Sequence, residues 1–230
     1  MRPSPKLDRM EGHTFIGNWI TPQSVIVDCG MNEGVFARRV MGKYGCRVIG
    51  IEANPGLAEQ NRTDRGLDCH NFAVCGCEGV VKFQVDHAHS MNSRIVDGAA
   101  VGPDIVEVQG STIETIVPLV NVTNIDLLKL DIEGAEIDVI ETASREFFSR
   151  IPQIAVEFHA FLDKSKKSSA IDCIKTIESA GFTSFDFSMN LGNVLFVNQK
   201  FYRTSLLDIG YFTFEKYRSG IRRTITKTHE

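Results

Sequence analysis

Apolar residues along this chain fall into two patterns, short β-branched runs and longer stretches at helical spacing. The run Val25–Val27 leads into Asp28 and a glycine-rich turn, after which residues 35–41 repeat at the spacing of a helix. A buried strand, a tight turn and a helix in this order are typical of the first unit of a nucleotide-binding α/β domain. Glycine lets the backbone of such a turn approach a ligand closely, and the helix begins with N–H groups that point toward it.

Strand and helix patterns continue to alternate along the chain, which predicts a doubly wound, mostly parallel sheet. Further core strands are expected over residues 47–52, 67–74, 125–131 and 153–159. Helices are expected from Pro55, after Gly134 and over 167–180, the second from the stripe Ile137, Ile140, Ala143 and Phe147. Two last strands, 183–188 and 193–197, predict an antiparallel hairpin at the end of the sheet. The predicted fold class is therefore α/β, Rossmann-like, with seven strands.

Residues 25–200 form the predicted domain, and the segments 1–24 and 201–230 flank it. The first is expected to be an irregular lead-in that packs over the domain through Phe15, Ile16, Trp19 and Ile20. The second carries several basic residues from Glu215 on, and this part is expected to be a solvated end, with docking of an acidic partner as the alternative. Residues 79–110 combine an exposed strand, a polar loop and a second strand before a helix over 111–119, which predicts an insertion near the active face.

Composition narrows the class of protein. A chain of 230 residues with 43% hydrophobic and 23% charged residues is ordinary for one large globular domain. The net charge of −4 gives no case for nucleic acid, and no apolar run approaches the roughly 20 residues of a membrane span. The first residues lack the apolar stretch of a signal peptide, and the six cysteines are scattered. Reduced thiols in a cytoplasmic protein are therefore expected.

Cys69, Cys75 and Cys77 are the closest cysteines in sequence. Their spacing lacks the paired C-x2-C of structural zinc sites, so we expect small buried hydrophobic side chains and no metal.

The glycine-rich turn differs from the dinucleotide fingerprint G-x-G-x-x-G. Asn32 stands where the middle glycine would make room for a pyrophosphate. Asn tolerates a left-handed backbone but keeps a side chain, so a cofactor without a pyrophosphate fits better than NAD. Glu52 ends the next strand 24 residues after Asp28, where an acid is placed to bond ribose hydroxyls.

Five motifs, taken together, resemble the FkbM-type S-adenosylmethionine-dependent methyltransferases. They are residues 28–34 (DCGMNEG), 52–55 (EANP), 71–74 (NFAV), 128–136 (LKLDIEGAE) and 156–159 (VEFH). The resemblance runs from about residue 25 to 197 and keeps the motifs in order. It implies the class I methyltransferase fold, S-adenosylmethionine as cofactor, and methylation of a hydroxyl on a sugar, glycan or natural product. No nucleic-acid partner and no membrane span are expected.

Roles for single residues also follow from the resemblance. The first motif would surround the methionine part of the cofactor, Glu52 would hold the ribose, and the residues around Ala53 and Phe72 would flank the adenine. Asp131 would lie near the methionine part, where a carboxylate attracts positive charge. The full set of implied cofactor-binding residues is Asp28, Gly30, Met31, Asn32, Gly34, Glu52, Ala53, Asn71, Phe72, Ala73 and Asp131.

Charged residues gather where two central strands are predicted to end. Lys129, Asp131 and Glu133 share one face of a regular strand, and Glu157 and His159 share a face on the next. Buried charges need partners, so Lys129 is expected to pair with Glu157 or with Asp131. Methylation of a hydroxyl requires removal of its proton. We therefore predict His159 as general base, with Asp131 or Glu133 orienting it or the acceptor.

Several alternatives remain open. Asp131, Glu133, Glu157 and His159 are oxygen-rich enough to bind a divalent ion such as Mg²⁺, although nothing in their spacing demands one. His87 and His89 could bind a metal or contact the substrate, with a solvated loop as the expected state. For the whole protein, the alternatives are a non-catalytic S-adenosylmethionine-binding module and an NAD(P)-dependent oxidoreductase. The sequence does not identify the acceptor or the oligomeric state.

Overall fold

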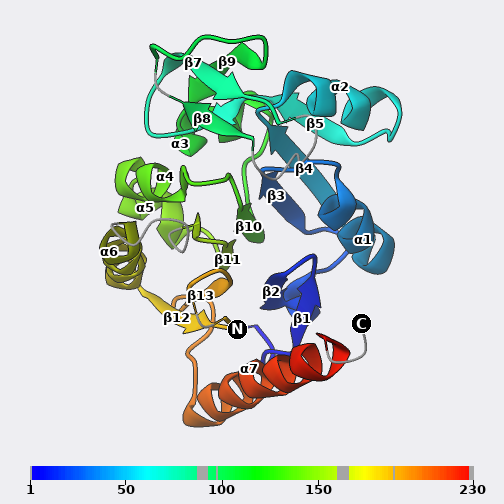
Figure 1. Ribbon diagram of the computed structural model, residues 1–230. Helices are drawn as coiled ribbons and strands as arrows, with labels where there is room; N and C mark the ends of the chain where they lie inside the picture. Colours follow the sequence, from blue (N-terminus) through cyan, green and yellow to red (C-terminus); the bar gives the residue numbers. More distant parts are fainter. Residues whose placement is uncertain (1, 87–92, 97, 160–165, 189, 228–230) are drawn as a thin grey trace.

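A seven-stranded sheet forms the centre of the computed structural model, which describes residues 2–86, 93–96, 98–159, 166–188 and 190–227 (Figure 1). The strand order is β12-β13-β11-β10-β3-β4-β5. All neighbours from β11 to β5 are parallel, whereas β13 is antiparallel to both β11 and β12. The strands are β3 (Val25–Cys29), β4 (Arg47–Glu52), β5 (Asp68–Asn71), β10 (Leu127–Leu130), β11 (Gln153–Val156), β12 (Phe182–Asp186) and β13 (Val194–Asn198). The predicted fold class is confirmed, including the antiparallel C-terminal hairpin.

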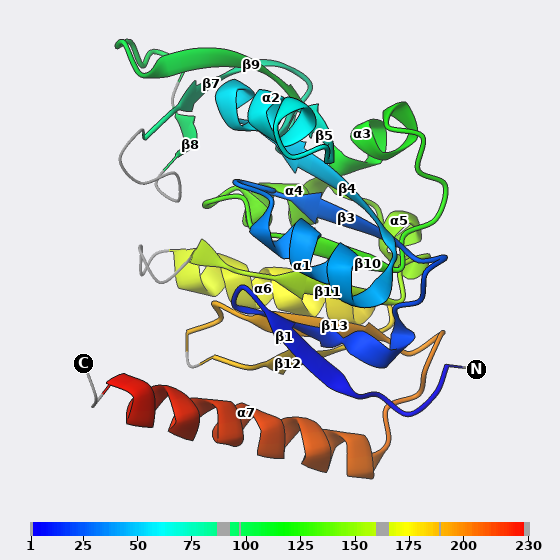
Figure 2. The same cartoon turned by 90° about the vertical axis from the view of Figure 1, so that its right-hand side faces the viewer.

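Helices cover both faces of this sheet (Figure 2). They are α1 (Val35–Tyr44), α2 (Pro55–Thr63), α3 (Ile113–Leu119), α4 (Glu136–Thr142), α5 (Arg145–Ser149), α6 (Lys166–Ser179) and α7 (Leu206–Lys227). Side chains of alternate strand residues point to opposite faces of the sheet and form a core on each face. Val27 and Phe196 pack with α3 to α6 on one face. Ile26 and Val48 pack with α1 and α2 on the other, as expected for a sheet buried on both sides.

Local sequence explains the helix ends. Asn54 caps α2 because its side chain accepts hydrogen bonds from the backbone N–H groups of Gly56 and Leu57, with Pro55 at the first helical position. The prediction of a single helix after Gly134 is wrong, because the chain forms two helices there. The chain leaves the helix at Ala143, and Ser144 caps a second helix through the N–H of Phe147. The apolar stripe continues across this break, so periodicity alone does not reveal it.

Residues 7–19 form regular structure, which corrects the expectation of an irregular lead-in for this part of the segment. Strands β1 (Leu7–Met10) and β2 (His13–Ile16) pair as an antiparallel hairpin, followed by the 3-10 turn η1 (Gly17–Trp19). The hairpin closes through Glu11 and Gly12, both with positive φ, as two-residue hairpin turns require. The predicted packing residues Phe15, Ile16, Trp19 and Ile20 are all buried.

A second sheet lies beyond the β5 edge of the first. Its order is β6-β9-β7-β8, with members β6 (Ala73–Val74), β7 (Gly79–Gln84), β8 (Arg94–Val96) and β9 (Ile105–Ser111). The strand predicted over 67–74 therefore splits at Phe72 between two sheets. Strand β7 lies between β8 and β9; its Phe83 is buried whereas its Val80 is exposed, so the strand expected to be exposed is exposed in part. His87 and His89 lie outside the described residues.

The C-terminal segment forms the long helix α7 (Figure 1), and in the part expected to be solvated, Tyr217 and Arg218 are exposed. Phe212 anchors it and is 1% exposed, in a small core shared with Trp19 of the N-terminal segment and Leu195 of β13. None of the helices described is both long enough and apolar enough to cross a bilayer. All six cysteines are free thiols; of the three expected to be buried, Cys69 and Cys75 are buried and Cys77 is exposed.

Candidate active site

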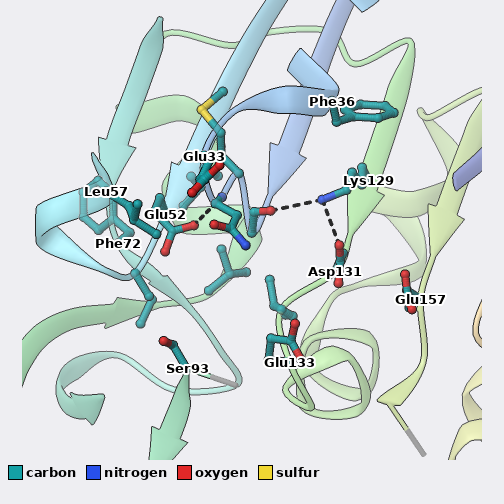
Figure 3. A pocket seen from close by; sticks show the side chains of 18 of the residues that line it. Glu33, Phe36, Glu52, Leu57, Phe72, Ser93, Lys129, Asp131, Glu133 and Glu157 are labelled. Atoms are coloured by element: carbon teal, nitrogen blue, oxygen red, sulfur yellow. Dashed lines mark hydrogen bonds and ion pairs between the residues drawn. The ribbon is translucent and has the colours of Figure 1, made fainter. Parts of the chain in front are cut away.

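A cavity of about 750 Å³ opens at the carboxyl ends of the central strands, next to the point between β3 and β10 where the strand order reverses. Its wall combines apolar side chains with six carboxylates. The apolar residues include Ile51, Ala53, Leu57, Phe72, Ala73 and Phe83. The carboxylates are Glu11, Glu33, Glu52, Asp131, Glu133 and Glu157. In Figure 3, Leu57 and Phe72 lie near Glu52 on one side, and Lys129, Asp131 and Glu157 lie on the other.

The β3–α1 turn forms the floor of the cavity. Gly30 has φ +77°, and a Cβ on it would lie 1.7 Å from the carbonyl oxygen of Asp131. Only glycine therefore lets this turn pass so close to the loop after β10. Asn32 adopts φ +51°, and its backbone carbonyl accepts a hydrogen bond from the Asn61 amide at 2.6 Å. Its side-chain Oδ1 is buried and has no hydrogen-bond partner among the described residues.

Glu52 joins this turn to the start of α2. Its Oε2 accepts a hydrogen bond from the backbone N–H of Asn32 at 2.7 Å, and its Oε1 accepts one from Asn54 at 2.8 Å. The side chain is 6% exposed, and burial raises the pKa of Glu52 against the effect of these two bonds. Two lone pairs on the carboxylate are left over for a ligand, because each oxygen can accept more than one hydrogen bond.

Lys129 neutralises the buried centre of the site. Its Nζ lies 2.9 Å from Asp28 Oδ1 and 3.3 Å from Asp131 Oδ2, and it donates a hydrogen bond to the carbonyl of Gly30. Burial disfavours its charge, but the two carboxylates raise the pKa of Lys129 above its usual value. One of the two pairings expected for Lys129, that with Asp131, is present. Its nearer partner is Asp28, on the neighbouring strand, whereas its pairing with Asp131 is drawn in Figure 3.

Asp131 has three cationic or donor groups around it. Besides Lys129, the Nε2 atoms of His13 and His159 lie 3.2 Å and 3.8 Å from its carboxylate. Burial works to raise the pKa of Asp131, but Lys129 and the histidines together hold it well below the usual range. Asp131 is therefore a fixed negative charge at the cavity wall.

His159 lies among three carboxylates. Its Nδ1 is 2.9 Å from Glu136 Oε1, and its Nε2 is 3.1 Å from Glu133 Oε2. Burial lowers the pKa of His159, but the carboxylates, with Glu136 first, outweigh it and raise the pKa to about 9. The imidazole therefore carries a proton at neutral pH, whereas a general base must start without one.

Glu133 faces the cavity from a strained position. Its backbone has φ +52°, a conformation that is uncommon for a residue other than glycine and concentrates at functional sites. Burial raises the pKa of Glu133 to about 7, against the lowering effect of His159. Glu136 supports the same loop, because its Oε1 also accepts hydrogen bonds from the backbone N–H groups of Ile132 and Gly134.

Beyond this geometry, the family model of the methyltransferase FkbM domain matches residues 28–184, more than half of the chain. The chain belongs to the FkbM methyltransferase family. The five motifs that suggested the family all fall in or next to the walls of the cavity or the loops beneath it. No curated protein matches this FkbM-family chain.

Solved structures similar to this FkbM-family protein are distant from it. An rRNA methylase from Streptococcus thermophilus has 14% identity and a TM-score of 0.41, over 78% of this chain and 88% of that one. A methyltransferase from Pyrococcus furiosus has 11% identity and a TM-score of 0.39, over 78% and 76%. A TehB-like methyltransferase from Corynebacterium glutamicum has 12% identity and a TM-score of 0.37, over 76% and 80%. The fold assignment depends on the strand order described above.

The structure brings most of the sequence-predicted residues together in the FkbM-family cavity. Those that line it are Gly30, Met31, Asn32, Glu52, Ala53, Phe72, Ala73, Asp131, Glu133 and His159. Asp28, Gly34 and Asn71 do not. Asp28 is fully buried beside Lys129, and the Asn71 amide donates hydrogen bonds to the backbone carbonyls of Glu52 and Ala53. These residues support the walls from behind.

Among the contributors that sequence reasoning missed are His13 and Glu136. His13 comes from the N-terminal hairpin, which no motif connected with the site. Glu136 lies inside the quoted motif, and its only signal was a carboxylate predicted on the first turn of a helix.

The residues of the magnesium alternative gather in two overlapping groups. Their ligand atoms lie within 4.8 Å of one another in the sets His13–Asp131–Glu157 and Asp131–Glu133–His159. In each set the histidine already lies against a carboxylate, and those contacts explain the arrangement without an ion.

Proposed function

We propose that this protein is an S-adenosylmethionine-dependent methyltransferase that methylates a hydroxyl on a sugar, glycan or natural product. The observation that carries the proposal is the charge of the cavity. Six carboxylates line it, and its one lysine is held between Asp28 and Asp131. Such a wall suits a ligand with positive charge on its sulfur and its amino group.

The residues present fit that cofactor. The unpartnered Asn32 Oδ1 and the carboxylate of Asp131 would receive the ammonium group at the β3–α1 turn. The remaining lone pairs of Glu52 would accept hydrogen bonds from the ribose hydroxyls, and Ala53, Leu57 and Phe72 supply an apolar slot for adenine. When bound, S-adenosylmethionine supplies a methyl group on a sulfonium, which is reactive enough that the protein need only orient the acceptor and take its proton.

The acceptor would occupy the polar side of the cavity. Hydroxyl groups of a polyol match the carboxylates of Glu11, Glu133 and Glu157, which accept hydrogen bonds from O–H donors. Protonated His159 would hold Glu133 in position. The role proposed for His159 is therefore to orient Glu133, whereas the sequence suggested that His159 is the general base. This favours small polar acceptors over hydrophobic ones.

Two alternatives fit less well. An NAD(P)-dependent oxidoreductase would place a pyrophosphate against the six carboxylates, where like charges repel. A non-catalytic binding module has no use for charged groups at the acceptor side, yet Glu133 keeps a strained backbone and a raised pKa there.

Calorimetric titration tests the cofactor. S-adenosylmethionine and S-adenosylhomocysteine should bind at micromolar concentration and NADH should not. Glu52→Ala should weaken binding at least tenfold, roughly the effect of losing a charge-assisted hydrogen bond. Glu59→Ala, on the exposed side of α2, is the matched control. Binding of NADH alone would overturn the proposal. Transfer of a labelled methyl group to a panel of methyl hexopyranosides and phenolic glycosides then tests the acceptor class.

A further inference from the structure

We infer that the N-terminal hairpin completes the active site and that His13 is the base that receives the proton of the acceptor. The inference rests on the proposed function, since it assigns a step of the same methyl transfer. The hairpin precedes the residues that the family model matches, which begin at Asp28. The base would therefore come from outside the family domain.

The hairpin reaches the site through its turn. Glu11 and His13 both line the cavity, and a Cβ on Gly12 would lie 4.0 Å from Glu157 Oε2. Buried side chains anchor the hairpin to the sheet. Gln153, which is fully buried, accepts a hydrogen bond from the N–H of Ile16 at 2.7 Å and donates one to its carbonyl at 3.3 Å. The turn is thus held at the carboxyl ends of β10 and β11.

The His13 ring is fixed in place. It is 2% exposed, and it packs edge-on against Phe36 with ring centroids 5.7 Å apart. Its Nε2 lies 3.2 Å from Asp131 Oδ2. Lys129 holds Asp131 ionised against the effect of burial, so this carboxylate can only accept a hydrogen bond. In the proposed reactive form Nε2 therefore carries the hydrogen toward Asp131, which leaves the lone pair on Nδ1.

That lone pair is what a general base needs. Among the described residues, no hydrogen-bond partner of His13 Nδ1 is found, whereas both ring nitrogens of His159 face carboxylates. Glu133 is the other basic group at the cavity wall, and it already lies 3.1 Å from His159 Nε2 as its ion-pair partner. A carboxylate on one nitrogen and the substrate on the other is the arrangement that orients a catalytic histidine and stabilises its charged form.

In the proposed step, the acceptor oxygen forms a bond to the methyl carbon while the carbon–sulfur bond breaks, and the electron pair of that bond stays on sulfur. The acceptor O–H bond breaks as its proton moves to His13 Nδ1. The resulting imidazolium is stabilised by Asp131, which follows β10, and by Glu157, which follows β11. Lys129 is the opposing charge, and Glu11 in the hairpin turn is already paired with Arg39. The proton then passes to water.

Nitrogen NMR of the histidine rings tests the assignment without an acceptor. Protein labelled with ¹⁵N-histidine and saturated with S-adenosylhomocysteine should show His13 neutral at pH 7.5, with its hydrogen on Nε2, and His159 doubly protonated. The signals are assigned by their loss in His13→Gln and His159→Gln. A charged His13, or one with its hydrogen on Nδ1, overturns the inference. Failure of S-adenosylhomocysteine to bind in calorimetry would instead count against the proposed function.

Measurements of turnover distinguish whether His13 acts as the base or only positions other groups. Gln keeps an N–H that can replace Nε2 toward Asp131 but cannot accept a proton. With any methyl hexopyranoside found to be methylated, His13→Gln should lower kcat by about 100-fold to 10,000-fold at unchanged cofactor affinity. It should also remove the rising limb of the pH–rate profile. Imidazole added to the buffer should partly restore the turnover of His13→Ala.

The matched control for these measurements is His70→Gln, which alters a histidine paired with Asp68 outside the cavity and should change nothing. Unchanged kcat in His13→Gln, with loss in Glu133→Gln, would assign the base to Glu133 and overturn the inference.

Discussion

At the scale of single residues, Lys129 decides whether the centre of the site can remain buried. Replacing it with Met removes the counter-ion of Asp28, which is fully buried. Breaking one side of a buried pair costs about 3–5 kcal/mol, because the remaining charge has no partner. We therefore expect Lys129→Met to lower the free energy of unfolding by that amount in urea titration. Asp28→Asn added to it should recover much of the loss. Arg47→Met, in an exposed pair with Asp68, should cost less than about 1 kcal/mol.

The protonation of His159 and Glu133 predicts how stability depends on pH. Both pKa values are raised by folding, His159 from 6.5 to about 9 and Glu133 from 4.5 to about 7. The folded protein therefore binds more protons than the unfolded chain between about pH 4.5 and 9, so its stability falls as pH rises through this range. The His159 contribution is complete below pH 6.5 and lost through pH 9. Urea unfolding at pH 6, 7.5 and 9 should show a shallower decline in His159→Gln; an identical decline would contradict the charged imidazole.

Sequence reasoning succeeded at residues whose role depends on chain neighbours. Asp28, Gly30 and Glu52 could be located because each lies at or just after the end of a strand that periodicity identifies. The partners of charged residues were harder, because they depend on three-dimensional packing. Asp28 faces Lys129 across the β3–β10 register, and no spacing in the sequence encodes that pairing. The charge of His159 was missed for the same reason, since two of its three carboxylates lie in the Asp131–Glu133 loop and the third on α4.

At the scale of elements, the β3–α1 turn is predicted to tolerate no side chain at Gly30. Gly30→Ala would place a Cβ 1.7 Å from the Asp131 carbonyl oxygen and would also strain a backbone with φ +77°. Gly66→Ala is the matched control, because its φ is +62° but nothing lies within 4 Å of the added carbon. Thermal unfolding should show a much larger loss for Gly30→Ala than for Gly66→Ala, and calorimetry should show loss of S-adenosylhomocysteine binding in the first alone. Equal losses would mean that φ and not crowding sets the requirement.

Element boundaries were predictable where a cap or a glycine marks them and not elsewhere. Asn54 marks the start of α2 and Gly181 follows the end of α6. The break between α4 and α5 keeps the apolar stripe in phase, so only the capping residue Ser144 signals it. The β1–β2 hairpin has a short polar turn and few apolar residues per strand, and its register depends on Gln153 and Asn193 from distant strands. Nothing local predicts that contact.

At the scale of the whole molecule, the net charge of −4 understates the field inside the cavity, where six carboxylates face one sequestered lysine and two histidines. That field should favour the cationic cofactor over its neutral product. S-adenosylmethionine differs from S-adenosylhomocysteine by one positive charge, so only its affinity should include the attraction of these carboxylates to the sulfonium. Salt screens such attraction, with a Debye length of about 10 Å at 0.1 M and about 3 Å at 1 M.

Calorimetric titrations at 20 mM and 500 mM NaCl test this. Raising the salt concentration should weaken S-adenosylmethionine binding by roughly threefold or more beyond any change for S-adenosylhomocysteine. Glu11→Gln removes one cavity carboxylate that belongs to the hairpin turn, and it should reduce this difference while leaving S-adenosylhomocysteine affinity unchanged. A difference that is the same at both salt concentrations would mean that short contacts, and not the summed field, distinguish the two ligands. In that case the acidic wall serves the acceptor, and Glu11→Gln should change the KM of the acceptor alone.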